Sequence, residues 1–285
     1  MGKEKTLYIT DLDGTLLGDN ARLSAYTRDT LNSLIANGLQ FSFATARSIV
    51  TASRCVAGLA LQGPVILDNG AIIIDYPTGK ILRKASLTEA VKDKMLDFLY
   101  TREIPVMVFA IVEGQDRVSW IEGWETEAMK RYVQDRKGSM RLRPVDNLEA
   151  LGAGEVIQLG FITTEEQARN LQDLCTRQGE SYGFFLEEDS RHEGDWRLEI
   201  YPAGLDKGTG VAQVKELLGV DKIVAFGDNL NDLPLFAVAD ECYAVANAKE
   251  ELKAVATGVI GSNEEDGVAR WLAEHGKFLA PPRKS

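Results

Sequence analysis

Two aspartates close together, Asp11 and Asp13, are the first residues in the chain whose type and spacing could do chemistry. They follow the apolar run 6–10, which predicts a buried strand, so both carboxylates should project from its carboxyl end. Two such close carboxylates repel and favour a shared proton or a bound cation. One can act as a nucleophile while the other handles protons. Gly14 would let the chain turn away.

Two other interpretations of this segment stay open. A solvated, aspartate-rich turn after a strand would need no chemistry. The pattern Asp-x-Asp-Gly also resembles part of a calcium loop, but Arg22 stands where the last ligand, a glutamate, would be required.

A second strand, predicted over 39–44, ends at a hydroxyl residue, Thr45, with Arg47 just beyond it. The Thr45 hydroxyl and the backbone N–H groups that open the next helix could bind a phosphoryl group. Threonine also caps many helices, so the feature alone is ambiguous. Lys207 opens another predicted helix, 207–218, where its charge is unfavourable with the helix dipole. A lysine that faces carboxylates and phosphate would explain this placement; a solvated lysine is the alternative.

A third strand, predicted over 223–226, ends in Gly227 and is followed by Asp228, Asn231 and Asp232. Hard oxygen ligands of this kind suit Mg²⁺, which takes few protein carboxylates and keeps several waters. A merely acidic loop is the alternative, and two further carboxylates at the tip of a neighbouring strand argue against it.

The elements that must position these residues alternate between strand and helix. Such alternation predicts an α/β fold with a parallel, Rossmann-like sheet and right-handed crossovers. The middle of the chain differs, with strands expected over 106–112 and 156–163 and helices over 89–100, 126–136 and 164–178. We therefore expect a core formed by residues 1–82 and 197–285, and an inserted α/β cap formed by residues 83–196. In the core, further helices are expected over 24–37, 48–61, 232–237, 252–256 and 268–275, and further strands over 65–67 and 242–245.

Composition narrows the classes of function. The chain has 285 residues, 45% of them hydrophobic, and a formal net charge of −11. That charge argues against a nucleic-acid partner, which requires a basic face. No apolar run is long enough to span a membrane and no secretory leader is recognisable, so we expect a cytoplasmic protein with no obligate protein partner. Three widely spaced cysteines predict neither a disulfide framework nor a zinc site.

Taken together, these segments resemble the haloacid dehalogenase superfamily. Asp11-x-Asp13-Gly-Thr15 resembles its first motif, Thr45 its second, Lys207 its third and Gly227-Asp228-x-x-Asn231-Asp232 its fourth. The insert between the second and third motifs resembles the large α/β cap of the Cof-like phosphatases, subfamily IIB. The stretches 68–71 and 263–269 also resemble that group. Ala46 departs from the pattern, since the group usually has glycine before Arg47.

The resemblance implies a phosphatase that forms an aspartyl-phosphate on Asp11 of a small phosphorylated metabolite, with a sugar phosphate as the expected class. Asp13 would act as the acid and base. Mg²⁺ would be held by Asp11, the backbone carbonyl of Asp13, and Asp228, with Asp232 direct or through water. Phosphate would be bound by Thr45, Arg47, Lys207 and Asn231.

Three other functions are alternatives to this one. A phosphotransferase or phosphomutase would use the same core, and nothing in the sequence excludes it. A dehalogenase would need no acid to protonate its leaving halide, so Asp13 argues against it. A non-catalytic sensor of sugar phosphates would not need both Asp11 and Asp13.

The core motifs leave no obvious group for the rest of the substrate, so specificity is expected in the cap. The candidates are polar and aromatic residues on expected loops, above all Arg191 and His192 in the segment 187–196, with Trp120, Trp124 and Trp196. Rings can stack on a sugar while Arg or His bonds its hydroxyls. An ordinary solvated acidic turn is the alternative for this segment.

Overall fold

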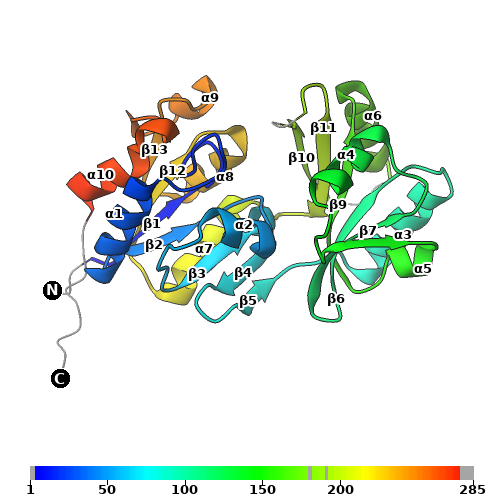
Figure 1. Ribbon diagram of the computed structural model, residues 1–285, viewed down its shortest axis with the longest axis horizontal. Helices are drawn as coiled ribbons and strands as arrows, with labels where there is room; N and C mark the ends of the chain where they lie inside the picture. Colours follow the sequence, from blue (N-terminus) through cyan, green and yellow to red (C-terminus); the bar gives the residue numbers. More distant parts are fainter. Residues whose placement is uncertain (1–3, 179–181, 190–191, 277–285) are drawn as a thin grey trace. The chain divides into compact units, whose positions relative to one another are not determined.

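The computed structural model describes residues 4–178, 182–189 and 192–276. The chain divides into two compact units, residues 1–84 with 205–285 and residues 85–204 (Figure 1). We expected the second boundary at residue 196. It lies later because β11 (Trp196–Pro202) is hydrogen-bonded between two strands of the second unit's sheet.

The first unit is built on a five-stranded sheet in the order β14-β13-β12-β1-β2. All its neighbouring strands run parallel, and β1 is buried along its whole length, as expected of a parallel sheet with both faces covered. The predicted α/β class with a parallel core sheet is therefore confirmed. The strands are β1 (Thr6–Thr10), β2 (Gln40–Phe43), β12 (Lys222–Gly227), β13 (Glu241–Val245) and β14 (Gly258–Ile260).

The helices of this unit begin and end where local chemistry requires it. Helix α1 (Ala25–Ala36) is capped by Ser24, whose Oγ accepts from the Thr27 N–H at 2.9 Å. Helix α2 (Ile49–Cys55) ends well before residue 61, where the sequence led us to expect its end, because Gly58 takes a left-handed φ of 87°. The remaining helices are α7 (Lys207–Leu218), α8 (Leu233–Val238), α9 (Glu250–Lys253) and α10 (Gly267–His275), with 3₁₀ turns η1 (Asp68–Gly70), η2 (Leu230–Asp232) and η3 (Asn263–Glu265).

A small antiparallel sheet adjoins the main one through β3 (Pro64–Leu67), which forms a parallel bridge from Ile66 to Ala44 just beyond β2. The two other strands, β4 (Ile72–Asp75) and β5 (Lys80–Lys84), were not predicted. Strand β5 is exposed or half-buried at every position, so its sequence carries no alternating apolar signal.

The second unit is a six-stranded sheet in the order β10-β11-β9-β6-β7-β8, antiparallel except between β7 and β8. Val108 and Leu159 pack in one apolar cluster with helices α3 and α6, whereas Met107 and Ile162 pack in another with α4. Helices therefore cover both faces, because alternate strand residues point to opposite sides. The elements are β6 (Met107–Val112), β7 (Gln115–Ile121), β8 (Leu142–Val145), β9 (Glu155–Thr163), β10 (Tyr182–Glu188), α3 (Glu89–Tyr100), α4 (Glu127–Asp135), α5 (Leu148–Leu151) and α6 (Glu165–Thr176).

Two expectations from composition can be compared with the structure. Within the described residues, no helix has the length and apolar character needed to cross a membrane. Cys55, Cys175 and Cys242 are all free thiols, and the last two are buried.

Candidate active site

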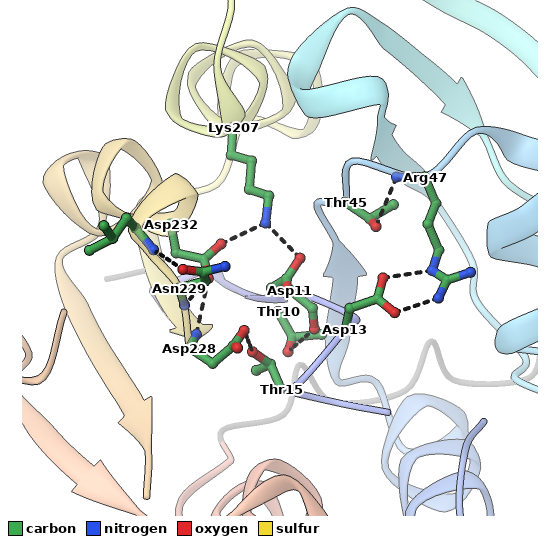
Figure 2. Close-up of polar contacts among 11 residues, drawn as sticks. Thr10, Asp11, Asp13, Thr15, Thr45, Arg47, Lys207, Asp228, Asn229 and Asp232 are labelled. Carbon is green, nitrogen blue, oxygen red and sulfur yellow. Dashed lines mark hydrogen bonds and ion pairs between the residues drawn. The ribbon is translucent and has the colours of Figure 1, made fainter. Parts of the chain in front are cut away.

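The chemistry-bearing segments of the first unit meet at one edge of its sheet. Strands β12, β1 and β2 are parallel neighbours, so the residues that follow them leave the sheet at the same edge. Asp228 follows β12, Asp11 follows β1 and Thr45 follows β2 (Figure 2). The parallel order thus gathers side chains that are far apart in the sequence.

Asp11 stands at the centre of this group. Its backbone N–H donates to the Phe226 carbonyl at 2.9 Å, which extends the pairing of β1 with β12 by one residue. The side chain is only 7% exposed, and its Oδ1 accepts from Lys207 Nζ at 2.6 Å. Burial raises the pKa of Asp11 well above its usual value, and the nearby Lys207 ammonium opposes this rise only in part.

Lys207 lies between two carboxylates. It is the first residue of α7, whose cap Asp206 accepts from the Thr209 N–H at 2.7 Å. The ammonium is 1% exposed and donates to Asp11 and, at 2.7 Å, to Asp232 Oδ1. Burial by itself would lower the pKa of Lys207, but the two carboxylates raise it above its usual value, so the group is charged. These ion pairs offset the unfavourable position of a lysine at a helix start.

The left-handed turn η1 packs against the beginning of α7. Asp68, Asn69 and Gly70 all have positive φ. A Cβ on Gly70 would lie 2.2 Å from the Asp206 carbonyl oxygen, so only glycine permits this approach. The Asn69 N–H donates to the Thr45 carbonyl at 3.0 Å. The turn therefore links the Thr45 loop to the helix that carries Lys207.

Asp232 organises the loop after β12. It is fully buried, and its Oδ2 accepts from the backbone N–H groups of Asp228 at 3.0 Å and Asn229 at 3.1 Å. A Cβ on Gly227 would lie 2.8 Å from the Asp232 side chain, which explains the glycine at that position. Because Oδ1 is bound to Lys207, both oxygens of Asp232 already have donors.

Asp228 approaches the first motif from the other side. Its Oδ1 accepts from Thr15 Oγ1 at 2.8 Å. Gly14 has φ 73°, and a Cβ there would lie 2.4 Å from Asp228 Oδ2, so glycine makes this contact possible. Burial first, and the Asp232 charge second, raise the pKa of Asp228 to about 6.

The acidic cluster fits a divalent cation. Asp11, Asp228 and Asp232 each offer a carboxylate oxygen, and these three atoms lie within 4.8 Å of one another. Three carboxylates face a single ammonium, Lys207, and the raised pKa of Asp11 and of Asp228 shows that full ionisation is disfavoured without further positive charge. Oxygen-only donors match Mg²⁺.

Arg47, which we expect to bind phosphate, is paired with Asp13 in this structure. Its guanidinium forms a bidentate ion pair with the Asp13 carboxylate, in which Nε donates to Oδ2 at 2.6 Å and Nη2 donates to Oδ1 (Figure 2). Thr45 is buried, and its Oγ1 accepts from the Arg47 N–H at 3.1 Å, so the hydroxyl hydrogen can still be donated to a ligand. Asn231 has a buried Oδ1 without a hydrogen-bond partner among the described residues.

The predicted cap residues have a different outcome. Arg191 lies outside the described residues. The His192 Nε2 atom lies 3.0 Å from Asp135 Oδ2, at the end of α4. The expectation that the tryptophans lie on loops is wrong for Trp120, which is buried in β7, and for Trp196, which begins β11. Trp124 stacks on Tyr100 at 5.1 Å between ring centroids.

Two residues that support the first motif were missed from the sequence. Asn247 Nδ2 donates to the Gly14 carbonyl at 2.7 Å, and its Oδ1 accepts from the Asn263 N–H at 3.0 Å. Asn263 Nδ2 in turn donates to the Leu17 carbonyl at 3.1 Å. The stretch 263–269, which contains Asn263, is indicated by its resemblance alone, and Asn247 carries no local signal.

The chain is similar to known proteins over most of its length. It matches the family model described as haloacid dehalogenase-like hydrolase over residues 8–272. It is 28% identical over 271 residues to the HMP-PP phosphatase of Serratia proteamaculans, with 92% of each chain covered. It is 24% identical over 281 residues to the 5-amino-6-(5-phospho-D-ribitylamino)uracil phosphatase YwtE of Bacillus subtilis, covering 92% of this chain and 95% of that one. The solved structure of TM0651 from Thermotoga maritima superposes with a TM-score of 0.79 at 24% identity, covering 96% of this chain and 98% of that one. The resemblance inferred from the motifs is confirmed.

Proposed function

Because the chain belongs to the family of haloacid dehalogenase-like hydrolases, we propose that it is a magnesium-dependent phosphatase that hydrolyses a small phosphorylated metabolite through an aspartyl-phosphate on Asp11. One observation carries the proposal. A buried carboxylate at the tip of β1 is held by a buried lysine and lies within a cluster of three carboxylates. This arrangement gives a nucleophile, a positive charge for phosphate and a metal site at one point.

Magnesium would be held by Asp11, Asp228 and the backbone carbonyl of Asp13. Both oxygens of Asp232 already accept hydrogen bonds from the protein, which favours contact with the metal through water for this residue. The bound metal supplies positive charge that offsets the repulsion between Asp11 and the phosphoryl group.

Asp11 then attacks phosphorus as the bond to the leaving oxygen breaks, and Asp13 gives its proton to that oxygen. In the second step Asp13 takes a proton from water, whose oxygen bonds to phosphorus and displaces Asp11. Lys207 and Thr45 bind phosphoryl oxygens, where the transferring group carries its negative charge.

Two further residues would complete the phosphate site. Asn231 would bind a phosphoryl oxygen through its Nδ2 hydrogens, since the amide oxygen can only accept. Arg47 would also contact phosphate. A sugar phosphate is the substrate class that we propose, with specificity contributed by Arg191 and His192 of the second unit.

The proposal is tested with Asp11→Asn, which keeps the shape of the side chain and removes the nucleophile. We expect phosphate release from a panel of phosphorylated metabolites to fall by about 10⁴-fold or more, because nucleophile losses in such enzymes are of this order. Asp29→Asn is the matched control, since that carboxylate is exposed and pairs with Arg28 at 2.9 Å. Activity in Asp11→Asn above a few percent of the parent would refute Asp11 as the nucleophile.

The same assay separates hydrolysis from phosphotransfer. An acceptor alcohol is added, and the products are counted as free phosphate or as new phosphate ester. Hydrolysis predicts free phosphate equal to substrate consumed, whereas a phosphotransferase would form the ester.

A further inference from the structure

In the ion pair between Asp13 and Arg47, each residue occupies groups that the other proposed roles require: the carboxylate for proton transfer and the guanidinium for phosphate binding. The two side chains come from the loops after β1 and β2, both in the first unit. The Arg47 side chain is 15% exposed and the Asp13 side chain is 51% exposed. Both carboxylate oxygens accept from the arginine, through Nε at 2.6 Å and through Nη2 (Figure 2).

This geometry is incompatible with Asp13 as a proton donor. A guanidinium has only N–H donors and no acceptor. A protonated Asp13 would turn an O–H donor toward one of those donors, so it cannot keep both bonds to Arg47. The same arginine cannot hold this carboxylate at two points and also bind a phosphoryl group with the same N–H groups.

We propose that Arg47 exchanges partners during turnover: it holds Asp13 in the substrate-free site and turns to the phosphoryl oxygens when phosphate occupies the site, which releases Asp13 for proton transfer. The inference rests on the proposed function and adds the order of events within it. Released Asp13 takes one proton from solvent and gives it to the leaving oxygen as the Asp11–phosphorus bond forms. It takes a proton back from the attacking water as that bond breaks.

The surroundings of Arg47 permit this exchange. Its backbone is fixed at both ends, because its N–H donates to Thr45 Oγ1 at 3.1 Å and its carbonyl accepts from the Asp68 N–H at 3.1 Å. Only the side chain therefore needs to rotate. A largely buried guanidinium requires an anion in each state. A phosphoryl dianion competes well with one carboxylate for a guanidinium, because it carries more charge and more acceptor oxygens.

The direct test compares two crystal structures of the full chain, one free of metal and one with Mg²⁺ and beryllofluoride, which mimics a phosphoryl group on Asp11. We expect the pair to be intact in the first. In the second, we expect Arg47 N–H groups to donate to the fluorines and at least one bond to Asp13 to be lost. An adduct on Asp11 with both Arg47–Asp13 bonds intact would overturn the exchange and leave the proposed function standing. An Asp11 that takes up no beryllofluoride would overturn both.

Single-turnover kinetics of Arg47→Ala give a second, independent readout. If Arg47 reaches the phosphoryl group, aspartyl-phosphate formation should fall by about 100-fold for 4-nitrophenyl phosphate and for an alkyl phosphate alike, as expected when one charge-stabilising donor is removed. Arg47→Lys should recover part of this loss. If Arg47 only positions Asp13, the loss should be confined to the alkyl ester, whose leaving oxygen needs the proton. That result would overturn the exchange.

Discussion

Replacing Lys207 by methionine tests whether the acidic cluster depends on one buried cation. Lys207 is 1% exposed and donates to Asp11 at 2.6 Å and to Asp232 at 2.7 Å. Methionine fills a similar volume without the charge, so both buried carboxylates lose their partner. Removing one partner of a buried ion pair costs about 3–5 kcal/mol. For a domain of this size that corresponds to a decrease in Tm of roughly 6–20 °C.

The assay is scanning calorimetry of Lys207→Met in EDTA and in Mg²⁺, at pH 5 and at pH 8. Without Lys207 the pKa of Asp11 should rise further, because the Lys207 charge lowers it. A carboxyl whose folded pKa lies above its unfolded pKa loses stability as pH rises between the two. The deficit in EDTA should therefore be larger at pH 8 than at pH 5, and Mg²⁺ should reduce it.

Lys215→Met is the matched control. Lys215 lies on the same helix, α7, with a side chain 37% exposed and 3.5 Å from Asp240. Its replacement should change stability by less than about 0.5 kcal/mol. Equal Tm values for the two variants in EDTA at pH 8 would refute the idea that Lys207 stabilises the buried carboxylates.

The other predictions concern the metal loop and the second unit. Gly14→Ala should weaken apparent Mg²⁺ affinity by about 10-fold or more, because its Cβ would lie 2.4 Å from Asp228 Oδ2. Gly79→Ala is the control, since Gly79 has a similar φ, 69°, but open space around it, and should keep full affinity. Equal affinities in metal titrations of the two variants would contradict this reasoning. Asp228→Asn should stabilise the metal-free protein, and the gain should grow from about pH 4 to about pH 6. Because the pKa of Asp228 in the folded protein is raised to about 6, the wild type loses stability as the pH rises through this range. Urea unfolding across this pH range measures the difference, and a constant one would show that Asp228 is not the group that titrates. His192→Ala should lower kcat/KM for the best natural substrate by about 10-fold and leave kcat/KM for 4-nitrophenyl phosphate unchanged. The control is His275→Ala, at the end of α10. A loss shared by both esters would exclude a role of His192 in specificity.

The outcome of the fold predictions follows from what each segment buries. Strand β1 and helix α7 were predicted at their observed positions because their apolar residues face the interior and α7 is bounded by Asp206 and Gly219. Strand β10 was missed because its residues are half-buried on both faces and show no alternation. The end of α2 was predicted too late because its apolar spacing continues past the turn at Gly58. Hydrophobic periodicity therefore predicts which residues are buried better than it predicts where the chain turns.

For the site, the residues that gather at the sheet edge can be predicted from the sequence. Asp11, Thr45 and Asp228 each follow an apolar run, and parallel strands bring such ends together whatever else the chain does. The pairing of the side chains depends on contacts between distant segments and cannot be predicted in the same way. Lys207 lies 196 positions from Asp11, and Arg47 lies 34 from Asp13. Local sequence therefore gives no register between the members of either pair. The position of Lys207 depends on the close approach of η1 to Asp206, which Gly70 permits.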